Sequence, residues 1–337
     1  MSKVLVTGGC GYIGSHTIVD LISNGYQVIS ADNFSNSHPF ILDRIQEITN
    51  REVRNYNIDL TNLEACRNMF AENPDLTGII HFAAFKSVPE SVEKPLLYYF
   101  NNLVSLQNVL QLANEFNVKS FVFSSSCSVY GNTTQLPVTE ETPIQHAESP
   151  YAFTKQIGEQ MVNDFYAVSK LSCILLRYFN PVGAHISGKI GELPIGPPLN
   201  LVPRITRTAI GKLTGMTVYG SDYPTRDGSN VRDYIHVMDI AHAHTLALEY
   251  IGKKINTELP EVFNLGTGNG ITTLEVIKAF EKVSGFKLDY KIGPRRPGDV
   301  VSIYADNQKA KEKLGWTCKY SLEDMMKTAW DWELTQR

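Results

Sequence analysis

The sequence predicts an α/β fold, a doubly wound parallel sheet with a smaller α/β domain at the C-terminal side for the substrate. Three observations support this prediction. Short apolar runs alternate with longer segments of helical periodicity. The runs are apolar throughout, which is typical of strands that are covered on both faces. A glycine-rich turn follows the first run, where such sheets bind ligands.

The predicted strands of the first part are KVLVT, QVISA, VRNYNI, GIIHF, SFVFSS and SCILLRYF. Helical periodicity separates them at residues 14–24, 39–49, 62–73, 96–116 and 151–169. Strands that alternate with helices predict right-handed βαβ units. With 43% hydrophobic residues in 337, the chain can fill a sizeable core.

The pattern changes after Asn180. Residues 181–230 are rich in Gly, Pro and Asn, and DYIHV, a helix at 238–251 and EVFNLG then indicate a return to the sheet. The tail has predicted helices near 273–284, 306–314 and 321–335. We therefore expect a Rossmann-like domain of residues 1–180 plus about 231–265, and a smaller domain of residues 181–230 plus 266–337.

Composition narrows the possible partners. The net charge is −4 without a block of five like charges, which argues against nucleic acid or a membrane surface as the main partner. The five cysteines are scattered and include no CxxC pair, so a reducing cytoplasm is favoured over disulfides or structural zinc. The chain shows no charged-then-apolar leader and no apolar run near 18 residues, so we expect neither a signal peptide nor a transmembrane helix.

The segment KVLVTGGCGYIGSH places Gly8, Gly11 and Gly14 between a strand and a helix. Gly8 permits a tight turn, and Gly11 lets backbone amides approach a pyrophosphate. Gly14 lets the helix pack on the strand, with its N-terminus facing the anion. An ordinary glycine-rich turn is the alternative, but the strand, helix and following acid favour a dinucleotide site.

That acid is Asp32, at the end of the second strand, where it suits the hydroxyls of an adenosine ribose. No Arg or Lys lies between Asp32 and Arg44 to pair with a 2′-phosphate, so NAD is favoured over NADP. Asp59, at the end of the third strand, is expected at the adenine.

The chain contains three Tyr-x-x-x-Lys spacings: Tyr151/Lys155, Tyr166/Lys170 and Tyr250/Lys254. A catalytic tyrosine must begin a helix close to the carboxyl ends of the strands, where the dinucleotide lies. Tyr151 does so, because Ser149 and Pro150 before it form a helix-start signal. The other two spacings are predicted to be solvated pairs at helix ends.

Lys155 and a positively charged nicotinamide are expected to lower the pKa of Tyr151 from about 10 to about 7, which takes roughly 4 kcal/mol. Tyr151 then takes a proton from a sugar hydroxyl while hydride leaves the same carbon. Ser126 is expected to bond that oxygen, with Ser124 nearest the strand; a merely polar strand end is the alternative. His242 and His244, two residues apart on a helix, are expected to be helix surface, and no metal is expected.

These residues resemble the extended short-chain dehydrogenase/reductases, and within them the UDP-sugar 4-epimerases. The resemblance covers nearly the whole chain, and several motifs together are specific where YxxxK alone is not. They are VLVTGGCGYIGSH, DNFSNS, IIHFAAFKSVPESVEKP, FSSSCSVYG, SPYAFTK, LLRYFNPVGAH, DYPTRDGSNVRDYIHVMD and RRPGD, in this order.

The resemblance implies NAD as cofactor and UDP-glucose and UDP-galactose as substrates, in a homodimer. Its NAD positions correspond to Gly8, Gly11, Tyr12, Ile13, Gly14, Asp32, Asn33, Asn36, Ser37, Asp59, Leu60, Phe82, Ala83, Ala84, Lys86, Asn101, Ser124, Tyr151, Lys155 and Tyr178. Its substrate positions correspond to Ser126, Tyr151, Asn180, Asn200, Leu201, Tyr219, Arg232, Arg296, Asp299 and Ile303. Arg232 and Arg296 suit the diphosphate and Asp299 a ribose hydroxyl, although each could instead form a surface ion pair.

The implied cycle does not consume NAD. Tyr151 deprotonates the 4-hydroxyl, NAD takes the C4 hydride, the 4-keto sugar turns over about its diphosphate link, and hydride returns to the other face. Binding energy should therefore come from the uridine diphosphate, with the sugar held loosely.

Three alternatives remain. The related 4,6-dehydratases carry an acid where this chain has Cys127 and Ser128, so dehydration or net oxidation is disfavoured. A non-catalytic dinucleotide sensor would be expected to lack Tyr151 or Lys155. At Ile303 the family tends to carry Tyr when it rejects N-acetylated sugars and a small residue when it accepts them, so turnover of UDP-N-acetylglucosamine stays open; we expect it to be weak.

Overall fold

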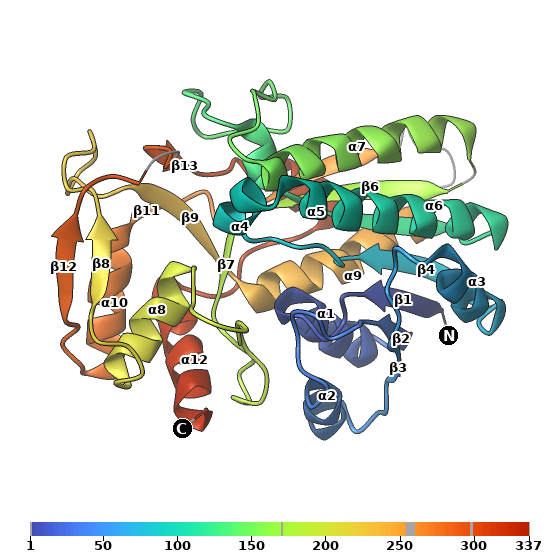
Figure 1. Cartoon of the computed structure of the whole chain (residues 1–337), viewed down its shortest axis with the longest axis horizontal. Coiled ribbons are helices and arrows are strands. Elements are labelled where there is room, and N and C mark those ends of the chain that lie inside the picture. The colour runs from blue at the N-terminus through green and yellow to red at the C-terminus, as the bar shows by residue number, and fades with distance from the viewer. Residues whose placement is uncertain (1, 170, 254–259, 297–298, 337) are drawn as a thin grey trace.

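A seven-stranded sheet forms the centre of the larger lobe of the computed structural model, which describes residues 2–169, 171–253, 260–296 and 299–336 (Figure 1). The strand order is β10-β6-β5-β4-β1-β2-β3, and every neighbouring pair is parallel. The prediction of a doubly wound parallel sheet is confirmed. The strands are β1 (Lys3–Thr7), β2 (Gln27–Ala31), β3 (Arg54–Tyr56), β4 (Leu76–His81), β5 (Ser120–Ser126), β6 (Ser172–Tyr178) and β10 (Glu261–Leu265).

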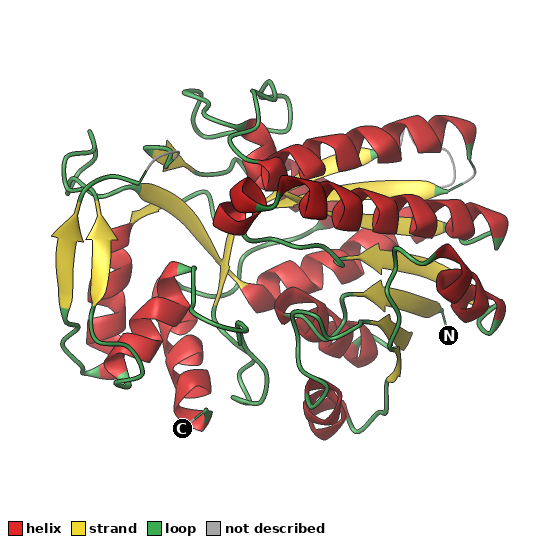
Figure 2. Cartoon of the chain, in the orientation of Figure 1, coloured by secondary structure: helices red, strands yellow, loops and turns green. Residues whose placement is uncertain are grey.

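Helices cover both faces of this sheet (Figures 1 and 2). Within β1, Val4 and Val6 pack into one apolar cluster and Leu5 into another on the opposite face. Burial on both faces is the reason why the strand sequences are apolar without alternation. One face carries α1 (Tyr12–Ser23), α2 (Ile41–Thr49) and α9 (Val237–Lys253); the other carries α3 (Leu63–Ala71), α6 (Ser105–Glu115) and α7 (Pro150–Val168).

The order of the strands reverses at the sheet centre. From β1 the chain proceeds outward to β2 and β3, and then returns to β4 on the other side of β1. Ligands of such sheets bind at this switch point, outside the carboxyl ends of the strands. The glycine turn after β1 therefore lies at the expected crevice.

The smaller lobe contains two small sheets with helices packed on them (Figure 2). In the four-stranded sheet, β9 (Val231–His236) pairs with β7 (Asn180–Val182), β11 (Gly270–Thr272) and β13 (Ser302–Ile303). The two-stranded sheet joins β8 (Met216–Tyr219) and β12 (Tyr290–Gly293). The helices of this lobe are α8 (Leu201–Ala209), α10 (Thr273–Ser284) and α12 (Leu322–Thr335), whereas α11 (Gln308–Leu314) packs with the core of the large sheet.

Capping explains where two helices of the tail begin. Thr272 and Glu275 form a capping box at the start of α10, and Ser321 and Asp324 form another at the start of α12. Both satisfy backbone amides that the first helical turn leaves free.

The prediction that DYIHV returns to the parallel sheet is wrong. This segment forms β9, which is the centre of the four-stranded sheet. The edge of the large sheet beside β6 is taken instead by β10, whose residues Glu261–Leu265 pair with Ile174–Tyr178. The helix after β9 does return to the large sheet, as predicted, since Thr245 of α9 donates a hydrogen bond to Asp20 of α1 at 2.6 Å.

The predicted helix at 96–116 is interrupted. It consists of α5 (Pro95–Tyr99), a π-helical turn η1 (Phe100–Val104) and α6, and α4 (Val88–Glu93) precedes it. Such π turns are frequent at functional sites, and η1 carries the predicted cofactor residue Asn101. Over the described ranges, no helix is long and apolar enough to cross a lipid bilayer.

Candidate active site

The glycine turn has the geometry that its sequence predicts. Gly8 has φ +66°, in the left-handed region, and its amide donates to the Ala31 carbonyl at 2.8 Å. A Cβ on Gly14 would lie 2.2 Å from the Gly8 carbonyl oxygen, so α1 packs on the turn at a distance that only glycine allows. Gly11 caps α1 without a side-chain hydrogen bond, which leaves amides of the first turn for an anion.

Asp32 joins the glycine turn to the loop after β2. Its carboxylate accepts hydrogen bonds from the amides of Cys10 (3.0 Å) and Phe34 (2.9 Å) and from the hydroxyl of Ser37 (2.8 Å). A carboxylate has about four acceptor positions, so a position remains for a ribose hydroxyl. Asn33, in the same loop, accepts from the Ser35 amide, and Asn36 is exposed.

The remaining predicted cofactor residues lie at the ends of β3 and β4. Asp59 is exposed and accepts from Thr61, whereas Leu60 is buried. The Phe82 amide donates to the Thr7 carbonyl, and the Ala83 amide to the Thr7 hydroxyl. The two bonds to Thr7 hold the loop after β4 against the end of β1, which leads into the glycine turn. Ile13 and Ala84 are half-buried.

Lys86 connects the cofactor loops to the smaller lobe. Its ammonium lies 6.0 Å from the Tyr12 ring centroid and 3.5 Å from Glu192. Tyr12 reaches across the lobes as well, because its hydroxyl donates to the Gly183 carbonyl at 2.6 Å. Burial raises the pKa of Tyr12 well above its ordinary value, with Glu192 adding to the rise, so this hydroxyl stays a donor.

Tyr151 and Lys155 lie in the first turns of α7. The Ser149 hydroxyl accepts from the Ala152 amide at 3.1 Å and Pro150 opens the helix, which confirms the predicted start signal. The Lys155 ammonium is buried and donates to the Ser124 carbonyl at 2.6 Å. It lies 6.0 Å from the centroid of the Tyr151 ring.

The predicted lowering of the Tyr151 pKa depends on a positively charged nicotinamide beside Lys155; the protein groups by themselves shift this pKa in the opposite direction. Burial raises the pKa of Tyr151 to about 12, against a hydrogen bond with Ser126 that lowers it. Burial also lowers the pKa of Lys155 to about 8, against the attraction of Glu159. The protein alone therefore keeps Tyr151 protonated, because the loss of water outweighs the hydrogen bond with Ser126.

The three serines at the end of β5 have different partners. Ser124 is hydrogen-bonded to Tyr178, and its carbonyl accepts from Lys155. Ser126 faces Tyr151 and also accepts from the Ser128 amide at 3.2 Å, which caps the 3₁₀ turn η2 (Cys127–Tyr130). Ser126 therefore has the alternative, structural role, and its hydroxyl also lies beside Tyr151.

His244 corrects a prediction. It was expected on the helix surface, but it is fully buried and its Nε2 lies 2.9 Å from the Tyr178 hydroxyl. His242 does lie at the surface, 3.3 Å from Asp20. In the described ranges, no group of three or more His, Cys, Asp or Glu residues is placed to hold a metal ion.

The competing Tyr-x-x-x-Lys spacings lie elsewhere. Lys170 and Lys254 fall outside the described residues. Tyr250 is buried and donates to Glu261, so its prediction as a solvated tyrosine is wrong. Tyr166 is half-buried, near the far end of α7.

Predicted substrate residues from the smaller lobe form two pairs. Arg232 lies 3.5 Å from Asp299, in the ion pair considered as an alternative, and donates to the Val300 carbonyl at 2.9 Å. The Arg296 guanidinium stacks 4.0 Å from the centroid of the Tyr219 ring. Both arginines are thus oriented by neighbours that were themselves predicted to bind the nucleotide.

Further predicted substrate residues lie closer to the sheet. Asn180 begins β7, and its buried Oδ1 has no hydrogen-bond partner among the described residues. Asn200 donates to Glu192 at 2.6 Å and is followed by Leu201 at the start of α8. Ile303 is buried in an apolar cluster that includes Tyr130, and Cys127 packs against this cluster; both residues belong to η2.

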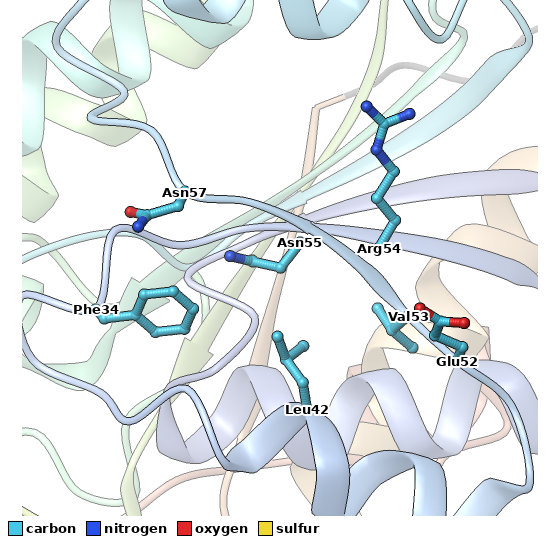
Figure 3. Close-up of a pocket in the computed structure, with 7 residues that line it drawn as sticks. All are labelled: Phe34, Leu42, Glu52, Val53, Arg54, Asn55 and Asn57. Carbon is cyan, nitrogen blue, oxygen red and sulfur yellow. The ribbon is translucent and has the colours of Figure 1, made fainter.

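A pocket of about 710 Å³ lies at the edge of the sheet, between β3 and α2 (Figure 3). The side chains of Phe34 and Leu42 point toward Asn55, which donates to the Asp32 backbone oxygen at 3.1 Å. The pocket therefore adjoins the predicted ribose loop but contains neither Tyr151 nor Lys155. Its lining is Phe34, Leu42, Glu52, Val53, Arg54, Asn55 and Asn57.

Several contacts of the site carried no sequence signal. Glu192 lies in the Gly- and Pro-rich segment, yet it joins Lys86 to Asn200. Asn102 accepts a hydrogen bond from the Phe85 amide and donates one to Thr154 of α7. These two bonds fix the loop after β4 against α7. A spacing rule would have found Glu159, four residues after Lys155, but not its partners.

Comparison with known proteins places this arrangement in a family. The family model described as GDP-mannose 4,6 dehydratase matches residues 5–329. UDP-glucose 4-epimerase of Bacillus subtilis is 48% identical over 98% of this chain and 96% of its own length. The corresponding protein of Drosophila melanogaster is 45% identical over 98% of this chain and 96% of its own length. The crystal structure of UDP-glucose 4-epimerase from Bifidobacterium longum with NAD+ and UDP has a TM-score of 0.94 at 45% identity, covering 99% of this chain and 98% of that one.

Proposed function

This chain belongs to the UDP-glucose 4-epimerase family of extended short-chain dehydrogenases/reductases, and we propose that Tyr151, Lys155, Ser126 and Ser124 perform its acid–base chemistry. The protein is an isomerase that interconverts UDP-galactose and UDP-glucose, with NAD as cofactor. One observation supports this assignment most directly. The Lys155 ammonium, one helical turn after Tyr151, donates a hydrogen bond to the Ser124 carbonyl at 2.6 Å.

The sheet lobe fits NAD. Free amides at the start of α1 suit a pyrophosphate, and the remaining acceptor position of Asp32 suits a ribose hydroxyl. The other predicted cofactor residues line the same carboxyl edge of the sheet. NAD held by these residues would supply the acceptor for the hydride of sugar C4 and the donor for its return to the opposite face.

Tyr151 exchanges the proton in this cycle. With NAD bound, the nicotinamide charge together with Lys155 would hold Tyr151 as a tyrosinate, against the rise of its pKa by burial. Tyr151 would then accept the proton of the 4-hydroxyl as hydride leaves C4, and return that proton to the oxygen when hydride comes back. Lys155 stabilises the tyrosinate by its positive charge, and Ser126 holds the sugar oxygen by a hydrogen bond. Because proton and hydride both return, substrate and product have the same composition.

The smaller lobe is proposed to hold the uridine diphosphate. Arg232 and Arg296 present guanidinium groups for the diphosphate, and the unpartnered Asn180 oxygen offers an acceptor. Asp299 and Tyr219 orient these arginines before the ligand arrives. We propose the predicted division into an NAD-binding domain, residues 1–180 plus about 231–265, and a UDP-sugar domain, residues 181–230 plus 266–337, with two changes: β9 belongs to the smaller lobe and α11 to the larger one.

The function is tested by incubating the purified protein with UDP-galactose and no added NAD. Formation of UDP-glucose is expected, because the cofactor is retained and recycled. Release of NADH or a keto-sugar after NAD is supplied, without UDP-glucose, would instead indicate net oxidation or dehydration.

A homodimer is proposed from an exposed apolar surface on α4, α5, η1 and α7. Leu96 is 79% exposed and Val92 61%. A contiguous surface of this kind on packed helices commonly marks a protein interface. Its other members are Val88, Leu97, Phe100 and Phe153.

Substituting Glu at both Val92 and Leu96 is therefore expected to convert the dimer to monomers, since two charges would be buried without partners. Sedimentation equilibrium at micromolar concentration measures this change. Val168→Glu, at an 83% exposed position near the other end of α7, serves as the control and should leave the dimer intact. A parent protein that is already monomeric would contradict the proposal.

Ile303 is proposed to set the tolerance for N-acetylated sugars, because it is buried beside Cys127 and Tyr130. The parent is expected to turn over UDP-N-acetylglucosamine weakly. Ile303→Ala should raise that rate by about tenfold and Ile303→Tyr should abolish it, within the range of one pocket contact. Turnover of UDP-galactose by the same variants is the control. Brisk UDP-galactose turnover without any detectable reaction of the N-acetylated sugar in the parent would refute the hypothesis.

A cytoplasmic location is also proposed. All five cysteines are free thiols in the structure, and Cys10, Cys66 and Cys173 are buried. Free thiols at every position are typical of proteins that work in a reducing compartment.

A further inference from the structure

We propose that Glu159 is a positioning residue for the epimerase reaction: it keeps Lys155 protonated and fixes the end of β5 against the catalytic turns of α7. This inference rests on the proposed roles of Tyr151 and Lys155. Glu159 lies one turn after Lys155 on α7, outside the residues that face the substrate.

Glu159 is held by a buried network. Glu159 and Arg177 are each 4% exposed, and they form two hydrogen bonds, from Nε to Oε1 at 2.8 Å and from Nη2 to Oε2 at 2.7 Å. Ser125 of β5 also donates to Oε1. The remaining Arg177 nitrogen donates to the Tyr130 hydroxyl at 2.9 Å, and Tyr130 donates to Asn264 at 2.6 Å. Each nitrogen of the guanidinium and each oxygen of the carboxylate therefore has at least one partner, as burial requires.

This network fixes the position of α7 along the end of β5. Ser126 is hydrogen-bonded to Tyr151, the Ser124 carbonyl accepts from Lys155, and Ser125 donates to Glu159. Three successive serines thus contact residues at three successive turns of the helix. A strand end and a helix tied at three points hold Tyr151 and Lys155 within the small tolerance that proton transfer needs.

The charge of Glu159 acts on Lys155. Burial lowers the pKa of Lys155 to about 8, and Glu159 is the carboxylate that opposes this lowering. The other groups around Lys155 supply no negative charge near pH 7. Burial lowers the pKa of His81 to about 3, and it raises the pKa values of Tyr151 and Tyr178 above their ordinary value. Arg177 is the counter-ion of Glu159.

Removing that charge should deprotonate Lys155 at a lower pH. Glu159→Gln keeps the shape and the acceptor for Ser125 but not the charge. We expect kcat for UDP-galactose at pH 7.5 to fall 10- to 100-fold, with KM changed less than twofold. The alkaline limb of the kcat–pH profile should move at least one pH unit toward acid, so that activity recovers as the pH is lowered toward 6.

A second variant protects the test against misfolding, since an unpaired buried arginine is destabilising. Glu159→Leu combined with Arg177→Met removes both charges and is expected to fold and to show an acid shift smaller than that of Glu159→Gln, because the lost Arg177 charge no longer repels Lys155. Tyr130→Phe is the matched control, because it removes one contact of Arg177 and keeps the charge of Glu159. Its profile should coincide with that of the parent.

Folded variants whose alkaline limb stays at the parent position would overturn the inference, even if kcat were lower, because a purely structural role predicts no shift. Failure of the parent to convert UDP-galactose in the same assay would instead count against the proposed function. The two failures are therefore distinguishable.

Discussion

Replacing Tyr151 with Phe is expected to lower turnover of UDP-galactose at least about a thousandfold while the purified protein still contains NAD. The change removes only the hydroxyl, so the ring keeps its packing near Lys155. Loss of a general acid–base group typically costs 100- to 10,000-fold, and a thousandfold loss corresponds to about 4 kcal/mol in the activation barrier.

The measurement combines single-turnover rates with the NAD content of the denatured protein. Tyr166→Phe is the control on the same helix, since Tyr166 lies four turns from Tyr151 and should be dispensable. A Tyr151→Phe protein with nearly normal turnover would move the proton transfer to another group. Loss of NAD together with activity would show that the hydroxyl holds the cofactor rather than the proton.

The free energy of unfolding is expected to fall by roughly 4 kcal/mol between pH 7.5 and pH 5.5, because histidines are buried without charge. Burial lowers the pKa of His16 and His81 to about 3, and of His236 and His244 to about 4. In the unfolded chain each titrates near 6.5. The unfolded chain therefore takes up protons first as the pH falls.

The stability that these histidines contribute is complete above about pH 6.5 and is lost as the pH falls from there toward their folded pKa values. Each loses about 1.4 kcal/mol per pH unit in that window. Asp239 acts in the opposite direction, because burial raises its pKa to about 6 and its protonation favours the folded state. The stability gained through Asp239 is smaller than the stability lost through the four histidines together.

Urea titrations with a fixed excess of NAD, at half-unit steps between pH 5.5 and 7.5, measure this dependence. His244→Gln should make the curve shallower by about one quarter, whatever its effect on stability at pH 7.5. His146→Gln, at an exposed position, is the control and should leave the slope unchanged. A stability that is flat over this range would show that the buried histidines are protonated or hydrated in the folded protein.

Local sequence patterns predicted the elements that depend on near neighbours. The apolar runs, the helical periodicity and the glycine turn identified the parallel sheet, and Ser149 with Pro150 selected Tyr151 among three candidates. Each of these signals is complete within about fifteen residues, because backbone conformation and capping are set by adjacent side chains.

Pairings between distant segments were not predictable in this way. DYIHV has the composition of a strand for either sheet, and its place was decided when β10 occupied the edge beside β6. His244 reads as helix surface, yet α9 places it against Tyr178. Such choices depend on which surfaces remain to be covered once the whole chain is folded.

By itself, the sequence determined the fold class, the glycine turn and the choice of Tyr151 as the tyrosine proposed to transfer the proton. The tertiary structure alone decided the electrostatics of that tyrosine. Burial raises the pKa of Tyr151 in the protein alone, and Arg177 of β6 reaches Glu159 of α7. Desolvation and charge pairing act through space between residues far apart in the chain, so no spacing along the sequence records them.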